Sequence, residues 1–316
     1  MVKERTTIKD VAKEANVTAQ TVSRVCRNLG YVPPATKERV LEACRKLNYL
    51  PNKSAISLRN GKANSIAVVF DSLKNIYFAI MTDYINDELA KRDYVLQPYF
   101  VKRSIIDTDI YLEAVSSGAS AVISFLQPTD DLEKTVKRYG VPLMIFGRRT
   151  DISDIDYVTT DDVEGGRIAA RRIIADGRKK LVFLGDGFGM TCVQDRYDGF
   201  EEELKKNGFN PEIVYYNRWA EGDEELETTL ENADGIFCFN DIIAYNVFRK
   251  ISCENKTVVG YDDIQSDLPM PIDLVSVGVD KKKYVEFMVD KLFEKLNKGT
   301  GEKIREIYEV RLSERR

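Results

Sequence analysis

The sequence predicts two parts of different fold class: a small all-α head and a larger α/β body with parallel sheets. The first 50 residues contain three amphipathic helical segments. From about residue 65, short continuous apolar runs alternate with helical stretches, which is the pattern of strands buried on both faces of a sheet. With 316 residues, the chain is long enough for this head and a body of two lobes.

The first helix of the head is expected to begin at Ile8. Thr7 is a typical N-cap residue, and Asp10 follows three residues later. Apolar residues then recur at helical spacing and form one stripe: Ile8, Val11, Ala12 and Ala15. A tight turn separates this helix from the next, so the pair forms a helix-turn-helix pattern.

The second helix is expected to begin near Thr18 or Ala19. Its apolar face consists of Val22, Val25, Cys26 and Leu29. Its other face carries side chains suited to phosphates and base edges, namely Gln20, Ser23, Arg24 and Arg27. A third helix from about Thr36 would close a three-helix core with Val40, Leu41, Cys44 and Leu47.

A basic head precedes an acidic body. Residues 1–60 contain 12 Lys and Arg against 5 Asp and Glu, whereas residues 61–316 contain 35 against 46. Because Lys and Arg displace condensed counterions from a nucleic acid backbone, this asymmetry favours a nucleic acid surface on the head. Without this charge asymmetry, the helix-turn-helix pattern would be equally compatible with a small helical subdomain whose polar face only contacts solvent.

The composition argues against several classes of protein. The chain has no histidine, which excludes His-based nucleophile activation and His-ligated metal sites. Its cysteines are odd in number and never at C-x-x-C spacing, so we expect reduced core residues without disulfides or bound metal. No phosphate loop is present, and Met190 stands where a dinucleotide fingerprint needs its third glycine. We expect a protein without enzymatic activity or cofactor, and we interpret the turn at 185–190 as the mouth of a cleft.

The chain lacks an apolar secretory segment at its amino terminus and any apolar stretch long enough to span a membrane. We therefore expect a cytoplasmic protein with no membrane partner.

Four segments of the head match the pattern of a known family. They read IKDVAKEA from Ile8, VTAQTVSRV from Val17, YVPPATKERV from Tyr31 and LNYLPN from Leu47. In these segments the chain resembles the LacI/GalR, or lactose repressor, family of bacterial transcription regulators. The resemblance implies that the second helix enters the major groove of DNA and contacts it through Thr18, Ala19, Gln20, Thr21, Ser23 and Arg24.

Residues 51–64 form a short, polar, glycine-containing connection between the head (1–50) and the body (65–316). The resemblance implies a hinge helix here, which orders on operator DNA beside its copy from a second subunit. Leu58 would then wedge into the minor groove, with Asn52 and Ala55 also at DNA-contacting positions. Ile56 stands where an arginine is common in the family, so one minor-groove contact is expected to differ.

The apolar runs of the body are too numerous for one compact sheet. They predict two similar α/β lobes, the first from about residue 65 and the second from about residue 160, with the chain crossing between them more than once. Such folds bind ligands at the carboxyl ends of their strands, between the lobes. The resemblance adds that the body is similar to periplasmic sugar-binding proteins.

Polar and aromatic residues at the predicted strand ends are candidates for this cleft. They are Asp71, Ser72, Asn75, Phe78 and Arg148 in the first lobe, and Arg196, Trp219, Asn240 and Asp262 in the second. The resemblance implies that residues such as Arg196, Asn240 and Asp262 hold a sugar or another small polar effector, and their hydrogen-bonding groups suit hydroxyls. Gly147 departs from family members that have an aspartate there. The alternative for each residue is a capping or turn role.

We therefore expect a homodimeric repressor that binds a pseudo-palindromic operator and is controlled by an effector, a sugar or sugar phosphate, bound between the lobes. An activator, a dual regulator and a corepressor-dependent repressor are alternatives within the class. A sugar-binding transport component would share the body but needs an export signal. A sugar kinase with a helix-turn-helix head would need a phosphate loop.

Overall fold

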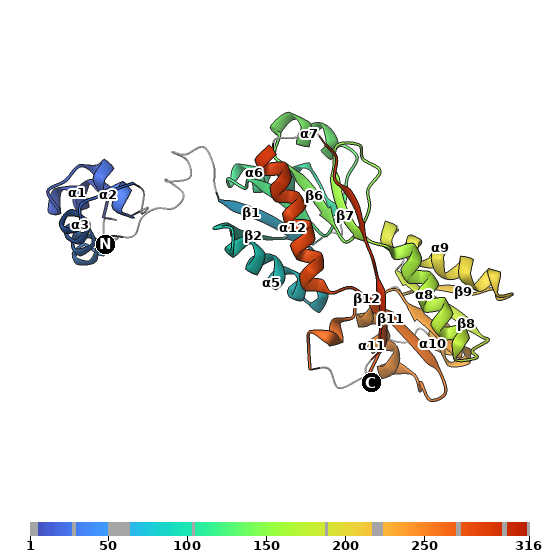
Figure 1. Cartoon of the computed structure of the whole chain (residues 1–316). Helices are drawn as coiled ribbons and strands as arrows, with labels where there is room; N and C mark the ends of the chain where they lie inside the picture. The colour runs from blue at the N-terminus through green and yellow to red at the C-terminus, as the bar shows by residue number, and fades with distance from the viewer. Residues whose placement is uncertain are drawn as a thin grey trace. The chain divides into compact units, whose positions relative to one another are not determined.

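A computed structural model of the chain describes residues 6–26, 30–49, 64–102, 105–186, 189–216, 224–269, 273–298 and 302–314 (Figure 1). The chain divides into two compact units, Met1–Ala63 and Asn64–Arg316. The hinge contacts predicted for Asn52, Ala55 and Leu58 lie outside the described residues. Within the described ranges, no helix is both long enough and apolar enough to cross a membrane.

The head contains the three predicted helices: α1 (Ile8–Glu14), α2 (Ala19–Cys26) and α3 (Pro34–Lys46). Thr7 caps α1 as predicted, because its hydroxyl accepts from the Asp10 N–H while the Asp10 carboxylate accepts from the Thr7 N–H at 2.8 Å. The three helices pack around a shared core in which the fully buried side chains are Val11, Val22 and Val40.

The prediction for Leu41 is wrong, because this side chain is 42% exposed. The helical stripe that faces the core runs through Val40, Ala43, Cys44 and Leu47, at spacings of three and four residues. Leu41 lies one position away from this stripe, and one residue corresponds to a large rotation around a helix. Predicted core residue Leu29 and outward-facing Arg27 lie outside the described residues.

All five cysteines of the chain are free thiols. The sulfur atoms of Cys26 and Cys44 lie 4.0 Å apart between α2 and α3. Burial, together with the neighbouring Cys44, raises the pKa of the Cys26 thiol to about 11, so it is protonated at neutral pH.

The first lobe of the body is built on a 6-stranded sheet in the order β13-β7-β6-β4-β1-β2. All its pairs are parallel. Its strands are β1 (Ser65–Phe70), β2 (Val95–Phe100), β4 (Ala121–Ser124), β6 (Leu143–Phe146), β7 (Asp156–Thr160) and β13 (Arg305–Tyr308). The helices of this lobe are α5 (Ile76–Ala90), α6 (Thr108–Ser116), α7 (Leu132–Tyr139) and α12 (Lys281–Lys298). Side chains of α5 and α12 pack on one face of the sheet, and those of α6 and α7 pack on the other.

The second lobe repeats this plan with the strand order β14-β12-β11-β10-β8-β9. Its strands are β8 (Leu181–Asp186), β9 (Glu212–Tyr216), β10 (Gly235–Cys238), β11 (Thr257–Tyr261), β12 (Val275–Gly278) and β14 (Arg311–Ser313). The helices are α8 (Asp162–Ala175), α9 (Thr191–Lys206), α10 (Glu224–Asn232), α11 (Asp241–Lys250) and the short η1 (Ile264–Ser266). The predicted α/β body with parallel sheets is confirmed, except that β14 pairs with β12 in antiparallel fashion.

The chain crosses between the lobes after β7, after β12 and after β13 (Figure 1). Strands β13 and β14, which each form one edge of a sheet, were not predicted from the sequence, and neither was the short ribbon of β3 (Ile105–Ile106) and β5 (Gln127–Pro128). The carboxyl-terminal segment therefore contributes to both lobes, since α12 and β13 belong to the first lobe and β14 belongs to the second.

Helices α8 and α9 approach each other closely because two glycines face the opposite backbone. A Cβ atom added at Gly199 would lie 1.8 Å from the carbonyl oxygen of Val163, and one added at Gly166 would lie 2.1 Å from that of Arg196. Only glycine fits such contacts. The close approach places Arg196 of α9 beside Asp162 at the start of α8.

Candidate functional sites

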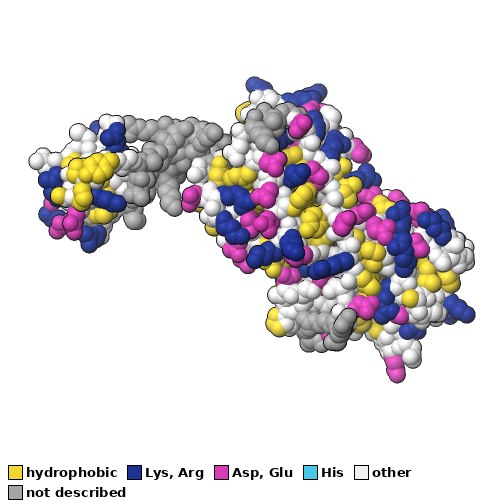
Figure 2. All heavy atoms as spheres, in the orientation of Figure 1, with side chains coloured by type: hydrophobic (Ala, Val, Ile, Leu, Met, Phe, Trp, Pro, Cys, Tyr) yellow, Lys and Arg dark blue, Asp and Glu magenta, His cyan; other side chains and the backbone are white. Residues whose placement is uncertain are grey.

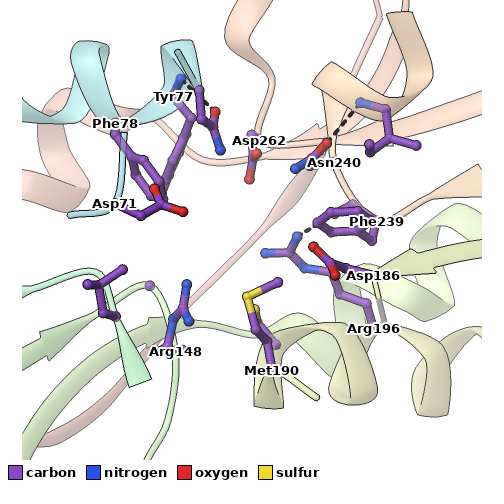
Figure 3. Close-up of a pocket in the computed structure, with 15 residues that line it drawn as sticks. Asp71, Tyr77, Phe78, Arg148, Asp186, Met190, Arg196, Phe239, Asn240 and Asp262 are labelled. Carbon is purple, nitrogen blue, oxygen red and sulfur yellow. Dashed lines mark hydrogen bonds between the residues drawn. The ribbon is translucent and has the colours of Figure 1, made fainter. Parts of the chain in front are cut away.

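A cavity of about 240 Å³ lies between the two lobes of the body (Figure 3). Most of its lining residues follow the carboxyl ends of β1, β4 and β6 in the first lobe and of β8, β10 and β11 in the second. This is the location at which open parallel sheets bind ligands. The lining consists of Asp71, Asn75, Tyr77, Phe78, Leu126, Gly147, Arg148, Asp186, Met190, Cys192, Arg196, Phe239, Asn240, Ile243 and Asp262.

The structure brings most of the predicted cleft residues together. Those that line the cavity are Asp71, Asn75, Phe78, Arg148, Arg196, Asn240 and Asp262. Ser72 does not line it, and its hydroxyl instead accepts from the Lys74 N–H at 3.1 Å in the turn after β1. Trp219 lies outside the described residues.

Asn75 and Asn240 have capping roles as well as positions in the cavity. The side-chain oxygen of Asn75 accepts from the Tyr77 N–H at 3.1 Å and begins α5. That of Asn240 accepts from the Ile243 N–H at 2.9 Å and begins α11. The caps fix both side chains and leave the amide nitrogen as the group that each can offer to a ligand.

Arg196 is held rigidly at the base of the cavity. Its Nε donates to Asp162 at 2.8 Å, its Nη1 donates to the Phe239 carbonyl, and its guanidinium lies 3.5 Å from the centre of the Tyr261 ring. Burial opposes the positive charge, but the Asp162 carboxylate outweighs it and holds the pKa of Arg196 well above its usual range. The side chain is therefore a charged donor that is already oriented before a ligand arrives.

Asp262 ends β11 in an unusual backbone conformation, with φ at +102°, and Asp263 follows with φ at +49°. Positive φ is costly for residues other than glycine, and such strain is concentrated at functional sites. Burial raises the pKa of Asp262 to about 7, although Arg196 and Lys281 oppose the rise. At neutral pH this carboxyl therefore exists in both forms and can accept or donate a hydrogen bond.

Polar contacts also join the lobes outside the cavity. Arg149, after β6, makes a bidentate pair with Asp195 of α9 at 2.7 and 2.8 Å. Tyr84 of α5 donates to Asp267 at 2.5 Å, and this bond raises the pKa of Tyr84 to about 12. Because Arg149, Tyr84 and Asp267 are half-buried, water can replace these contacts when the angle between the lobes changes.

In the head, the outward face of α2 is polar and accessible. Gln20 and Arg24 are exposed, whereas Ala19, Thr21 and Ser23 are partly buried. Thr18 is exposed, and its hydroxyl accepts from the Thr21 N–H at 3.2 Å, which caps the helix. Of the predicted DNA-contacting residues, Gln20, Ser23 and Arg24 therefore lie on the face of α2 opposite the buried Val22 and Val25.

On the face of the body in view, acidic and basic side chains are interspersed (Figure 2).

Comparison with known proteins supports the family. Residues 7–52 match the model of a family described as bacterial regulatory proteins, lacI family. The chain is 29% identical to the ribose operon repressor of Lactococcus lactis over 82% of each chain, and 26% identical to the HTH-type transcriptional repressor PurR of Aliivibrio salmonicida over 96% of each. Residues 7–52 thus match the lacI family, and the chain is similar to bacterial repressors over most of its length.

Solved structures share the fold of this chain. The lac repressor dimer bound to operator and the anti-inducer ONPF has a TM-score of 0.82 at 22% identity, covering 99% of this chain and 98% of that one. A complex of the transcriptional regulator CelR with cellobiose has a TM-score of 0.66 at 24% identity, covering 98% of each chain.

Several lining residues of the cavity were not predicted from the sequence pattern, including Leu126, Cys192 and Phe239. They are apolar or sulfur-containing residues at strand ends and in α9, and their spacing resembles that of core residues. Asp186 and Met190 line the cavity as well, in agreement with the interpretation of the turn at 185–190 as the mouth of a cleft.

Proposed function

We propose that this LacI-family chain is a transcriptional repressor whose affinity for operator DNA is controlled by a small-molecule effector bound between the lobes. One observation carries the proposal. The same chain combines an exposed polar α2 face in a basic head with a polar cavity between the two lobes of an α/β body.

The head provides the DNA-binding part of the proposal. Arg24 and Gln20 are exposed on α2 and suit phosphate or base-edge contacts in the major groove. The net positive charge of residues 1–60 supplies the nonspecific attraction to the DNA backbone. The chain acts as a homodimer on a pseudo-palindromic operator, as the solved lac repressor dimer bound to operator suggests by its similar fold.

The cavity provides the effector-binding part. Its polar groups include two guanidinium groups, two amides and three carboxyl groups, which together suit the hydroxyls of a sugar or sugar phosphate. Phe78 and Phe239 add aromatic surface for the apolar face of a sugar ring. Relatives and structural neighbours named for ribose, sucrose and cellobiose support this class of effector.

An effector that contacts both lobes favours one angle between them over another. Polar interlobe contacts such as Arg149–Asp195 and Tyr84–Asp267 then break and are replaced by others. The altered angle between the lobes is transmitted to the residues that connect body and head. The predicted hinge helix in 51–64, with Leu58 as its wedge, is the element that this change would order or release. Because the protein acts by binding chromosomal DNA and needs no chemical step, we assign it to the bacterial cytoplasm and to no enzyme class.

The test uses the purified full-length protein. Its operator is selected from a random double-stranded DNA library, and binding is then measured by fluorescence anisotropy with and without sugars and sugar phosphates. We expect sequence-specific binding that one effector changes at least tenfold. Arg24→Ala should weaken operator binding by more than about 1 kcal/mol and leave effector binding unchanged, whereas Arg196→Met should weaken effector binding and leave operator binding without effector unchanged. Absence of any selected sequence would refute the proposal.

A further inference from the structure

Two thiols lie in contact in the head, where α2 packs against α3. Cys26 is the last residue of α2, and Cys44 lies 18 positions later in the last turn of α3, with its sulfur atom 4.0 Å from that of Cys26. Both side chains are half-buried at the edge of the head core, so a small oxidant can reach them from solvent. Neither residue is a predicted DNA contact, and the proposed function leaves the pair unexplained.

The separation of the two sulfur atoms is close to what a disulfide needs. Starting from 4.0 Å, they must approach by about 2 Å to reach the length of an S–S bond. A cysteine side chain has a single torsion, and a helix restricts its staggered positions. We therefore expect part of the approach to come from the helices themselves. Joining the pair pulls the carboxyl-terminal end of α2 toward α3.

The same end of α2 carries a predicted DNA contact. Arg24 lies two residues before Cys26 and is exposed on the opposite face from Val22 and Val25. A side chain that contacts a base edge or phosphate keeps its donor–acceptor distance within about 2.7–3.2 Å, so a displacement of about 1 Å is enough to break the contact. Movement at Cys26 is therefore transmitted directly to the surface that binds DNA.

We propose that Cys26 and Cys44 form a redox switch in the head, in which oxidation to a disulfide displaces the end of α2 and lowers operator affinity, and reduction restores it. The inference goes beyond control by an effector, because it acts within the head and does not involve the cavity of the body. It rests on the proposed DNA binding by α2.

Peroxide is the class of oxidant that fits this pair. One sulfur attacks an oxygen of hydrogen peroxide, the O–O bond breaks, and a sulfenic acid and one water molecule form. The second sulfur then attacks the sulfenic sulfur, so that the S–S bond forms, the S–O bond breaks and a second water molecule leaves with the remaining thiol proton. Two thiols and one peroxide thus give one disulfide and two water molecules. A dithiol reverses the step through a mixed disulfide.

The reduced pair is the resting state. Burial, together with the neighbouring Cys44, raises the pKa of the Cys26 thiol to about 11, so little thiolate is present at neutral pH. Because the thiolate is the reactive form, we expect slow reaction with mild oxidants such as glutathione disulfide and a response only to sustained peroxide. Disulfides that form in a reducing compartment are usually transient and sense redox conditions, which suits this role.

The test uses the full-length protein and its selected operator duplex. Operator affinity is measured by fluorescence anisotropy at fixed salt before peroxide treatment, after it and after reduction with dithiothreitol, and mass spectrometry of peptides locates the disulfide. We expect a Cys26–Cys44 disulfide, a loss of operator affinity of at least about tenfold, and recovery on reduction. The disulfide without a loss of affinity, or a loss of affinity without this disulfide, would overturn the proposal.

Serine variants separate the pair from other oxidisable residues. Reduced Cys26→Ser and Cys44→Ser should each bind operator like the wild type and keep that affinity after peroxide. Cys253→Ser is the matched control, since it removes a half-buried thiol of the body and should respond to peroxide as the wild type does. An equal loss of affinity in Cys26→Ser would assign the peroxide effect to another residue and overturn the switch. If a serine variant does not fold, alanine replaces serine at that position.

A measurement without DNA distinguishes failure of the switch from failure of the proposed function. Oxidation of the full-length protein should shift the NMR amide signals of Gln20 and Arg24, and dithiothreitol should return them. If the reduced protein selects no operator but these signals shift, the DNA-binding proposal fails while the coupling of the disulfide to α2 stands. Unchanged α2 signals in the oxidised protein would overturn the switch.

Discussion

Replacing Gly199 with alanine should separate α8 from α9 and displace Arg196 from the cavity. A Cβ atom at this position would lie 1.8 Å from the Val163 carbonyl oxygen and 2.7 Å from its carbon. To restore an ordinary nonbonded separation, the helices would have to move apart by roughly 1.5 Å. The Nε of Arg196 lies 2.8 Å from Asp162, so a movement of this size breaks their hydrogen bond.

Two opposing effects set the change in stability. Alanine is favoured over glycine within a helix by about 1 kcal/mol, whereas overpacking costs about 1–3 kcal/mol. We expect the upper end of that range, because the obstructing atoms belong to the backbone of α8 and cannot rotate away. The net loss is then about 2 kcal/mol, which corresponds to a fall in melting temperature of about 4–8 °C for a body of this size.

Differential scanning calorimetry and effector titration measure the two consequences. Asp198→Ala is the matched control, since it lies next to Gly199 on the exposed face of the same helix and should stay within about 0.5 kcal/mol of the wild type. Gly199→Ala should also bind the effector at least tenfold more weakly. If Gly199→Ala proves as stable as the wild type or more so, helix propensity dominates and the close backbone contact does not position Arg196.

Three other changes test the remaining parts of the account. Arg24→Ala should weaken operator binding by more than about 1 kcal/mol, the worth of one good major-groove or phosphate contact, and unchanged affinity in a gel-shift titration at fixed salt would contradict this docking. Leu58→Ala should reduce DNA bending and operator affinity but leave effector binding intact, and equal bends in a circular-permutation assay would exclude the wedge. The Asp262 carboxyl has a pKa raised to about 7, and a sugar hydroxyl that donates to it binds the ionised form. As the pH increases towards 7, effector affinity should therefore rise by up to about tenfold per pH unit, and above pH 7 it should level off. In Asp262→Asn, effector affinity should not depend on pH in this way.

Local patterns in the sequence predicted the parts of the fold that depend on local physics. The Thr7–Asp10 capping pair and the apolar spacing in α1 and α2 predicted those helices, because caps and periodicity act within a few residues. The buried central strands such as β1 and β4 were equally clear from their continuous apolar runs. By contrast, β13 and β14 are half-exposed edge strands, whose pairing depends on distant parts of the chain.

The same distinction applies to the cavity. Polar residues at strand ends, such as Asp71, Arg148 and Asp262, could be chosen from sequence because the carboxyl ends of parallel strands share one edge of the sheet. What the sequence could not provide is which of them lack partners. Arg196 is satisfied by Asp162, whereas Arg148 is not, and this difference arises from packing between elements far apart in the sequence.

The most direct test of the central claim is a measurement of coupling between the two sites in the full-length protein. Operator affinity is measured by anisotropy with and without saturating effector, and effector affinity by calorimetry with and without saturating operator. Thermodynamic linkage requires the change in operator affinity on adding effector to equal the change in effector affinity on adding operator. We predict that both affinities change by the same factor, between about 5 and 150. If operator and effector bind tightly but neither changes the affinity of the other, the body does not control the head and the account is contradicted.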